Sequence, residues 1–252
     1  MDIVNPDLSH MDFLDLATSD IKSSYALLQA REYHNAVYHF QQSVEKSCKY
    51  LGLTMKLFTF DELRQISHEP QRVFDKIFSS KIFTDVYRDN DYDLFKKEIH
   101  ELSTDDKTYY SYNKIQNSIN RHHEERLGKL PSEIVVEHYS NNPFSIHNSS
   151  ISVLIENAKV MKGYPKCENI CEQLIARNDN MEICVFSQML MSFLVSGVEA
   201  NSRYPDKKGA TPNNIYSEKS TMVQYLDYFI EKQLFCIEIL ENYFKAIERS
   251  VC

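Results

Sequence analysis

The apolar residues of this chain recur at helical spacing. Near the N-terminus they follow i, i+3, i+4 and i+7, which is typical of one face of an amphipathic helix. This first stripe predicts a helix over residues 8–30 and consists of Leu14, Ala17, Ile21, Tyr25 and Leu28. A second stripe predicts a helix over residues 33–51, with Gly52 as its stop; its members are Ala36, Val37, Phe40, Val44, Cys48 and Leu51.

The same reasoning predicts helices along most of the remaining chain. The segment Thr59–Glu62 has the spacing of a capping box and predicts a short helix that runs through His68. Further helices are expected over residues 104–127, 151–161, 180–200 and 218–249, with a loop over 201–214. No window shows the alternation of paired strands. We therefore predict an all-α fold, an up-and-down helical bundle.

Composition narrows the class of protein. The chain has 252 residues with only 5 Gly and 7 Pro, and no glycines are spaced as GxGxxG or GxxxxGK[ST]. This argues against a Rossmann or P-loop nucleotide enzyme. The formal charge of −8 argues against a broad nucleic-acid footprint but not against a local one.

Two further features bear on location. Polar residues interrupt the apolar stretch 180–200, so we expect a buried bundle helix there and no membrane partner. The six cysteines are scattered, and the first residues lack the pattern of a signal peptide. Reduced thiols and a cytoplasmic location are the expectation.

Three short pieces of sequence then stand out. The first, Tyr33–Lys49, has a Tyr-x-x-Ala start followed by Gln-x-x-Glu-Lys and another Lys. The second, Leu63–Glu69, ends in Ile-Ser-His-Glu, and the third, Asn201–Asp206, contains Arg-Tyr-Pro-Asp before a long helix. Together and in this order they resemble the HEPN domain family, whose second motif usually has Gly where Ser67 stands.

The resemblance implies a domain plan and a set of partners. HEPN-like helices would occupy residues 8–82 and 180–250, and residues 84–178 would form a helical insertion or a separate lobe. The family implies a homodimer, a nucleotidyltransferase-like partner protein, and RNA or nucleotide as ligands, in a prokaryotic toxin–antitoxin or defence system. It also implies ligand-binding positions, namely Gln42, Glu45, Lys46, Arg203, Tyr204 and Asp206.

These positions have a functional and a structural interpretation. In the first, Arg64, His68 and Arg203 converge at one end of the bundle and form a small basic cleft for a phosphate or an acidic partner. In the second, Glu45 forms an i, i+4 pair with Lys49. Arg203 and Tyr204 attach a loop to the bundle, and His68 caps a helix break.

Catalysis depends on a motif that this chain lacks. The ribonucleases of the family have Arg and His separated by four to six residues, whereas Arg64 and His68 have three between them. At i, i+4 they would still share one helix face. We expect a binding protein. The alternatives are a metal-independent endoribonuclease that uses Arg64 and His68, and an interaction protein that uses the insertion.

No metal or cofactor is predicted. Cys167 and Cys171 are one residue too far apart for CxxC, and no second ligand pair follows at zinc spacing. HExxH is absent as well.

Overall fold

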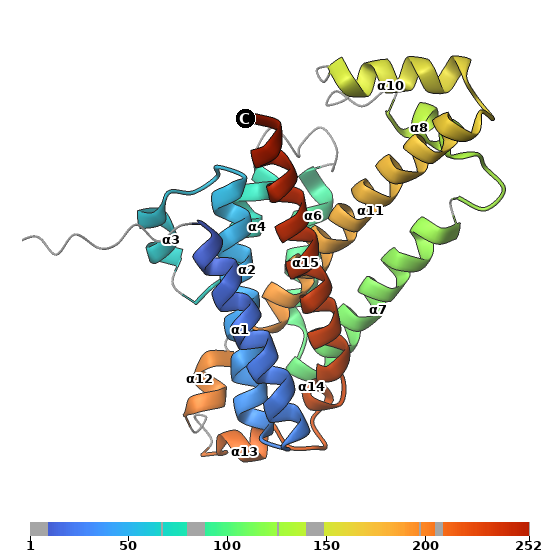
Figure 1. Cartoon of the computed structure of the whole chain (residues 1–252). Helices are drawn as coiled ribbons and strands as arrows, with labels where there is room; N and C mark the ends of the chain where they lie inside the picture. The colour runs from blue at the N-terminus through green and yellow to red at the C-terminus, as the bar shows by residue number, and fades with distance from the viewer. Residues whose placement is uncertain are drawn as a thin grey trace, which may run out of the picture. The chain divides into compact units, whose positions relative to one another are not determined.

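A computed structural model describes residues 10–66, 68–79, 89–124, 126–139, 149–196, 198–204 and 209–251. Over these residues the secondary structure consists of helices, with no strand, which confirms the all-α prediction. The helices are α1 His10–Gln29, α2 Tyr33–Thr54, α3 Phe60–Ile66, α4 Gln71–Ser79, α6 Asp89–Glu101, α7 Thr104–Glu124, α8 Pro131–Tyr139, α10 Ser149–Val160, α11 Pro165–Leu194, α12 Val198–Arg203, α13 Pro212–Ile215, α14 Thr221–Gln224 and α15 Leu226–Val251 (Figure 1). None of these helices combines the length and the apolar composition that a membrane span requires.

The chain divides into two compact units. The first comprises residues 1–115 and 184–252, and the second comprises residues 116–183, so the divisions fall within α7 and α11. The insertion was expected to begin at residue 84, but α6 and the start of α7 pack in the first unit. The ring of Phe95 in α6 lies 5.6 Å from that of Phe193, and Tyr112 in α7 lies 4.8 Å from Tyr225.

In the first unit, α1 and α2 form an antiparallel pair that packs against α15 (Figure 1). The predicted stripe of α1 is confirmed at Leu14, Ala17 and Ile21, which are buried. It was wrong at Tyr25, whose surface is 49% exposed. The buried face runs instead through Ser24, whose hydroxyl donates to the Ala36 carbonyl oxygen of α2 at 2.8 Å. A small side chain at this level lets the two backbones approach closely.

A buried polar layer crosses the core of the first unit. The side-chain oxygen of Gln188, Oε1, accepts from Ser47 Oγ at 2.9 Å and from Cys48 Sγ at 3.3 Å. Its amide nitrogen donates to Gln233 Oε1 at 2.8 Å, and Gln233 Nε2 donates to Ser43 Oγ at 3.1 Å and Ser47 Oγ at 2.9 Å. The layer thus joins α2, α11 and α15. Because its members satisfy one another only in this register, it specifies how these helices pack.

Gly52 does not end α2 as predicted, since the helix continues to Thr54. A Cβ atom at Gly52 would lie 2.9 Å from the ring of Phe58. A residue without a Cβ fits here because the segment after α2 folds back onto the helix. The residue with left-handed backbone after the helix is Lys56 (φ 55°), not Gly52. The requirement is therefore close packing rather than a helix stop.

The predicted helix and loop over residues 180–214 also differ from the structure. Helix α11 begins at Pro165, fifteen residues before the predicted start, and residues 205–208 of the predicted loop lie outside the described part. The loop prediction was wrong where the structure has helices α12 and α13. Tyr216, directly after α13, is buried. Tertiary packing thus supports short helices in a segment rich in Pro and Asn.

The second unit has its own small core, to which α8, α10 and α11 contribute. The buried residues are Ile134, Val135, Ile155, Ala158, Cys167, Cys171 and Ile175. Burial raises the pKa of Cys171 to about 12, and Cys167 beside it contributes. The Cys171 thiol therefore acts as a small apolar core residue rather than as a reactive group, and the buried Cys167 packs in the same core.

Glu168 ties the helices of the second unit together. Its carboxylate accepts from the Ser132 backbone N–H at 2.8 Å, the Ser132 hydroxyl at 2.6 Å and the Gly163 backbone N–H at 2.6 Å. Partial burial raises the pKa of Glu168, but these hydrogen bonds lower it by more, so that it lies below its ordinary value. The ionised form is therefore the one that the folded unit favours.

A lowered carboxyl pKa makes stability depend on pH. Glu168 should stabilise the fold above the ordinary glutamate pKa of about 4.3, and this contribution should fade as the pH falls through the lower folded value. We expect Glu168→Gln to lower the melting temperature at pH 7 and to have a much smaller effect near pH 2.5. Thermal melts at both pH values measure this. An equal loss at both would show that the carboxylate charge is irrelevant.

Candidate functional site

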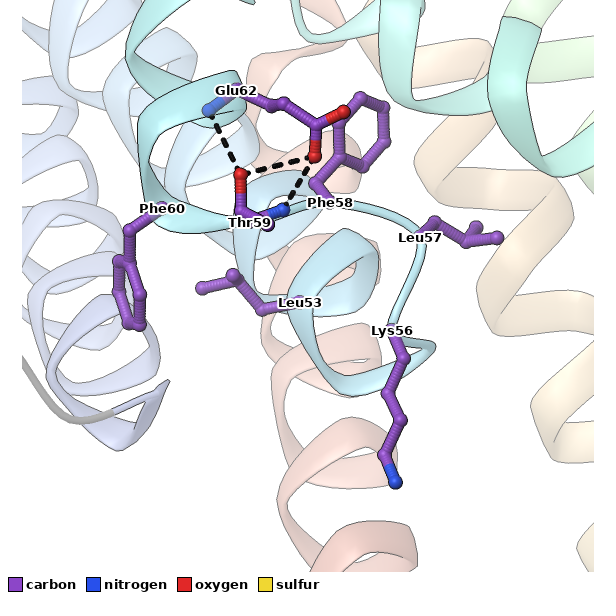
Figure 2. Close-up of a pocket in the computed structure, with 7 residues that line it drawn as sticks. All are labelled: Leu53, Lys56, Leu57, Phe58, Thr59, Phe60 and Glu62. Carbon is purple, nitrogen blue, oxygen red and sulfur yellow. Dashed lines mark hydrogen bonds between the residues drawn. The ribbon is translucent and has the colours of Figure 1, made fainter.

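The segment that leads from α2 into α3 contributes to a groove. The Thr59 backbone N–H donates to Glu62 Oε2 at 2.7 Å, and the Glu62 N–H donates to Thr59 Oγ1 at 3.3 Å (Figure 2). This confirms the predicted capping box. The hydrogen bonds from Thr59 and Lys76 lower the pKa of Glu62. Helix α3 ends at Ile66, two residues before His68.

A groove of about 430 Å³ lies beside this capping box. Its lining is mostly apolar and consists of Leu53, Lys56, Leu57, Phe58, Thr59, Phe60 and Glu62 (Figure 2). Phe60 also stacks on Phe13 of α1, with ring centroids 6.2 Å apart. The groove contains none of the residues that the resemblance assigns to ligand binding.

Glu45 is the centre of the site. Its side chain is only 6% exposed, yet it is ionisable and has three hydrogen-bonding partners. Lys49 Nζ donates to Oε1 at 2.6 Å, and Gln41 Nε2 donates to Oε2 at 3.0 Å. His68 Nδ1 lies 3.0 Å from the same Oε2. The predicted i, i+4 pair with Lys49 is therefore present, and His68 joins it from outside the helix.

The contact with Glu45 constrains the chemistry of His68. A carboxylate can only accept a hydrogen bond, so His68 Nδ1 must carry the proton that it donates. The ring is thus held as the Nδ1–H tautomer or as the imidazolium, in one orientation. The His68 side chain is 52% exposed. A carboxylate that orients an exposed imidazole in this way suits either phosphate binding or proton transfer.

Gln42 and Lys46 are the other predicted residues of α2. Gln42 Nε2 donates to Gln41 Oε1 at 2.7 Å and so supports the Glu45 cluster through Gln41. Lys46 forms an ion pair with Asp20 of α1, which His39 also contacts at 2.9 Å. Lys46 therefore connects α2 to α1.

Arg203 and Tyr204 lie beside a different part of α2. The Arg203 guanidinium carbon is 5.7 Å from the ring centroid of Tyr38 and 5.6 Å from that of Tyr204, which is within range of cation–π attraction. The Tyr204 side chain is 60% exposed. Asp206, the last predicted ligand-binding residue, lies outside the described residues.

Of the three residues predicted to converge, Arg64, His68 and Arg203, the structure describes the side-chain contacts of the last two, and they lie at separate levels of α2. The Arg64 side chain lies outside the described part, although its backbone belongs to α3. His68 contacts α2 at Glu45, and Arg203 contacts it at Tyr38, seven residues earlier. Seven residues are two helical turns, about 10 Å, so both contacts lie on the same face of α2 but at two levels.

Sequence reasoning missed Tyr38 and Gln41. The spacing Tyr38, Gln42, Glu45, Lys49 is i, i+4, i+7, i+11, which is a single helical face. That pattern could have identified Tyr38 as part of the site. Gln41 is buried and stands four residues before Glu45, so the i, i+4 rule that pairs Glu45 with Lys49 also places it beside that carboxylate.

Comparison with known proteins adds no assignment. No family model, no curated protein and no solved structure matches the chain. Within the described residues, no three His, Cys, Asp or Glu side chains gather into a group that could hold a metal ion.

Proposed function

We propose that this chain is a HEPN-like protein that binds a phosphate-bearing ligand, RNA, along the polar face of α2. One observation carries the proposal: of the three pieces of sequence that resemble the family, the second and the third each contact the first, which lies on this helix. The hydrogen bond between Glu45 and His68 joins the first piece to the second. The contact between Tyr38 and Arg203 joins the first to the third.

The charges along this face suit an anion. Lys46, Lys49 and Arg203 are cationic, and His68 becomes so when it is protonated. Two carboxylates, Asp20 and Glu45, oppose them and are largely buried, whereas His68 and Arg203 are exposed. A chain with a net charge of −8 would bind RNA only at such a local patch.

A binding experiment tests the proposal. We expect the protein to bind a labelled single-stranded RNA of ten nucleotides, with an affinity that falls as salt rises. His68→Gln/Arg203→Gln should raise Kd at least tenfold in fluorescence anisotropy. The matched control, Lys97→Gln/Lys219→Gln, removes two exposed cations elsewhere in the first unit and should leave Kd within twofold. The proposal fails if the wild type shows no salt-dependent binding.

A metal-independent endoribonuclease is the second candidate. The specific observation in its favour is the buried carboxylate of Glu45 that orients His68, an arrangement that also serves general acid–base catalysis. The purified protein would then cleave structured RNA in EDTA, and His68→Ala would abolish cleavage. Cleavage that survives this substitution would exclude His68 as the acid–base residue.

The homodimer, the nucleotidyltransferase-like partner protein and the toxin–antitoxin role are further proposals that rest on the resemblance alone. Light scattering of the purified chain tests the first of them directly.

A further inference from the structure

Tyr204 presents an aromatic ring to solvent that the phosphate-binding proposal does not use. It follows α12 directly and is 60% exposed. One side of this ring is supported by the Arg203 guanidinium, 5.6 Å from the ring centroid. Tyr204 nevertheless remains mostly exposed.

Arg203 also contacts the α2 helix. The same guanidinium lies 5.7 Å from the ring of Tyr38, which belongs to α2, so Arg203 links an exposed ring to a helix of the bundle core. Helix α12 packs against α2 near the end where α2 begins (Figure 1). Exposed aromatic rings and guanidinium planes held in this way are the groups on which proteins stack unpaired nucleobases.

The spacing along α2 of the residues that this aromatic group and His68 contact bears on the length of the ligand. The anchors of the two groups on α2, Tyr38 and Glu45, are separated by about 10 Å along the helix. Stacked nucleotides rise by about 3.4 Å each, so about three steps, or four nucleotides, would reach from one group to the other. A single nucleotide would reach only one of them.

From this arrangement we infer that Tyr38, Arg203 and Tyr204 form a stacking platform for an unpaired base, and that the ligand is single-stranded RNA of at least about four nucleotides. This inference rests on the proposed function, which it deepens by naming the ligand's strandedness and length. A duplex keeps its bases paired and stacked, and so could offer this platform no base.

Oligonucleotide length tests the inference. We would measure Kd for labelled single-stranded oligoadenylates of two, four, six and eight nucleotides and for an eight-base-pair RNA duplex. The wild type should gain at least tenfold in affinity between two and six nucleotides and bind the duplex more weakly than the single-stranded octamer. Tyr204→Ala should raise Kd for the hexamer about tenfold, because stacking contributes about 1–3 kcal/mol per base.

Two variants separate stacking from other effects. Tyr204→Phe keeps the ring and should bind the hexamer within twofold of the wild type. Tyr109→Ala removes another exposed tyrosine of the first unit, at 57% exposure, and should also leave Kd unchanged. Circular dichroism melts would verify that each variant folds.

The outcomes distinguish the inference from the proposed function. Absence of wild-type binding to every RNA would overturn both. Wild-type binding that is equal at all lengths, or equal for the duplex and the single strand, would overturn the platform while leaving the phosphate site. The same conclusion would follow if Tyr204→Ala bound the hexamer as tightly as the wild type.

Discussion

Replacing Glu45 by alanine should lower the free energy of unfolding by about 3 kcal/mol, the cost typical of removing one partner from a buried ion pair. The carboxylate accepts hydrogen bonds from Lys49 at 2.6 Å and Gln41 at 3.0 Å, and it holds His68 at 3.0 Å. Lys49 is itself only 14% exposed, so its charge would remain in the protein without a carboxylate. Chemical denaturation measures the loss.

The control for this variant is Glu238→Ala. Glu238 is an exposed glutamate in α15 of the same unit, and its replacement should change stability by less than about 0.5 kcal/mol. If Glu45→Ala cost no more than this control, the cluster would be a surface ion pair rather than a buried anchor.

Gln188→Leu should also be strongly destabilising, by about 2–3 kcal/mol. The substitution removes the Gln188 acceptor of Ser47 Oγ and Cys48 Sγ and leaves Gln233 Oε1 without its donor. Each buried polar group left unsatisfied costs about 1–3 kcal/mol. Denaturant unfolding, read as a shift in midpoint at constant slope, measures the effect.

A double-mutant cycle makes this prediction specific. Gln188→Leu/Gln233→Leu should destabilise by less than the sum of the single variants, because removing both partners leaves fewer unsatisfied groups than removing one. The control is Ser192→Ala, a buried serine of the same helix whose hydroxyl donates within α11 to Met189 O at 2.7 Å. It should cost under about 1 kcal/mol, and strict additivity of the glutamine variants would contradict the network.

Local signals in the sequence predicted the first two helices well. Apolar spacing placed α1 and α2 within a few residues, because burying one stripe of an amphipathic helix is what stabilises it. The same signal failed for α11, whose first half is mixed in composition. Its buried residues, such as Cys171 and Ile175, face a small separate core that no local pattern reveals.

The candidate site was foreseen only in part. The i, i+4 pair of Glu45 with Lys49 follows from helix geometry and was predicted from the sequence. The contact of His68 with Glu45 joins residues 23 positions apart, and that of Arg203 with Tyr38 joins residues far more distant. No spacing rule connects such pairs, since they depend on how α3 and α12 return to α2.

The sequence by itself therefore determined the class of this protein: helical, with its main amphipathic stripes and its capping box at Thr59, because these depend on neighbours within one or two turns. Only the tertiary structure decided that α6 belongs to the first unit, that Gly52 serves close packing, and that His68 and Arg203 contact α2 at two levels. These features depend on contacts between distant segments, where side-chain shape and hydrogen-bond geometry select among packings that the same hydrophobic pattern allows.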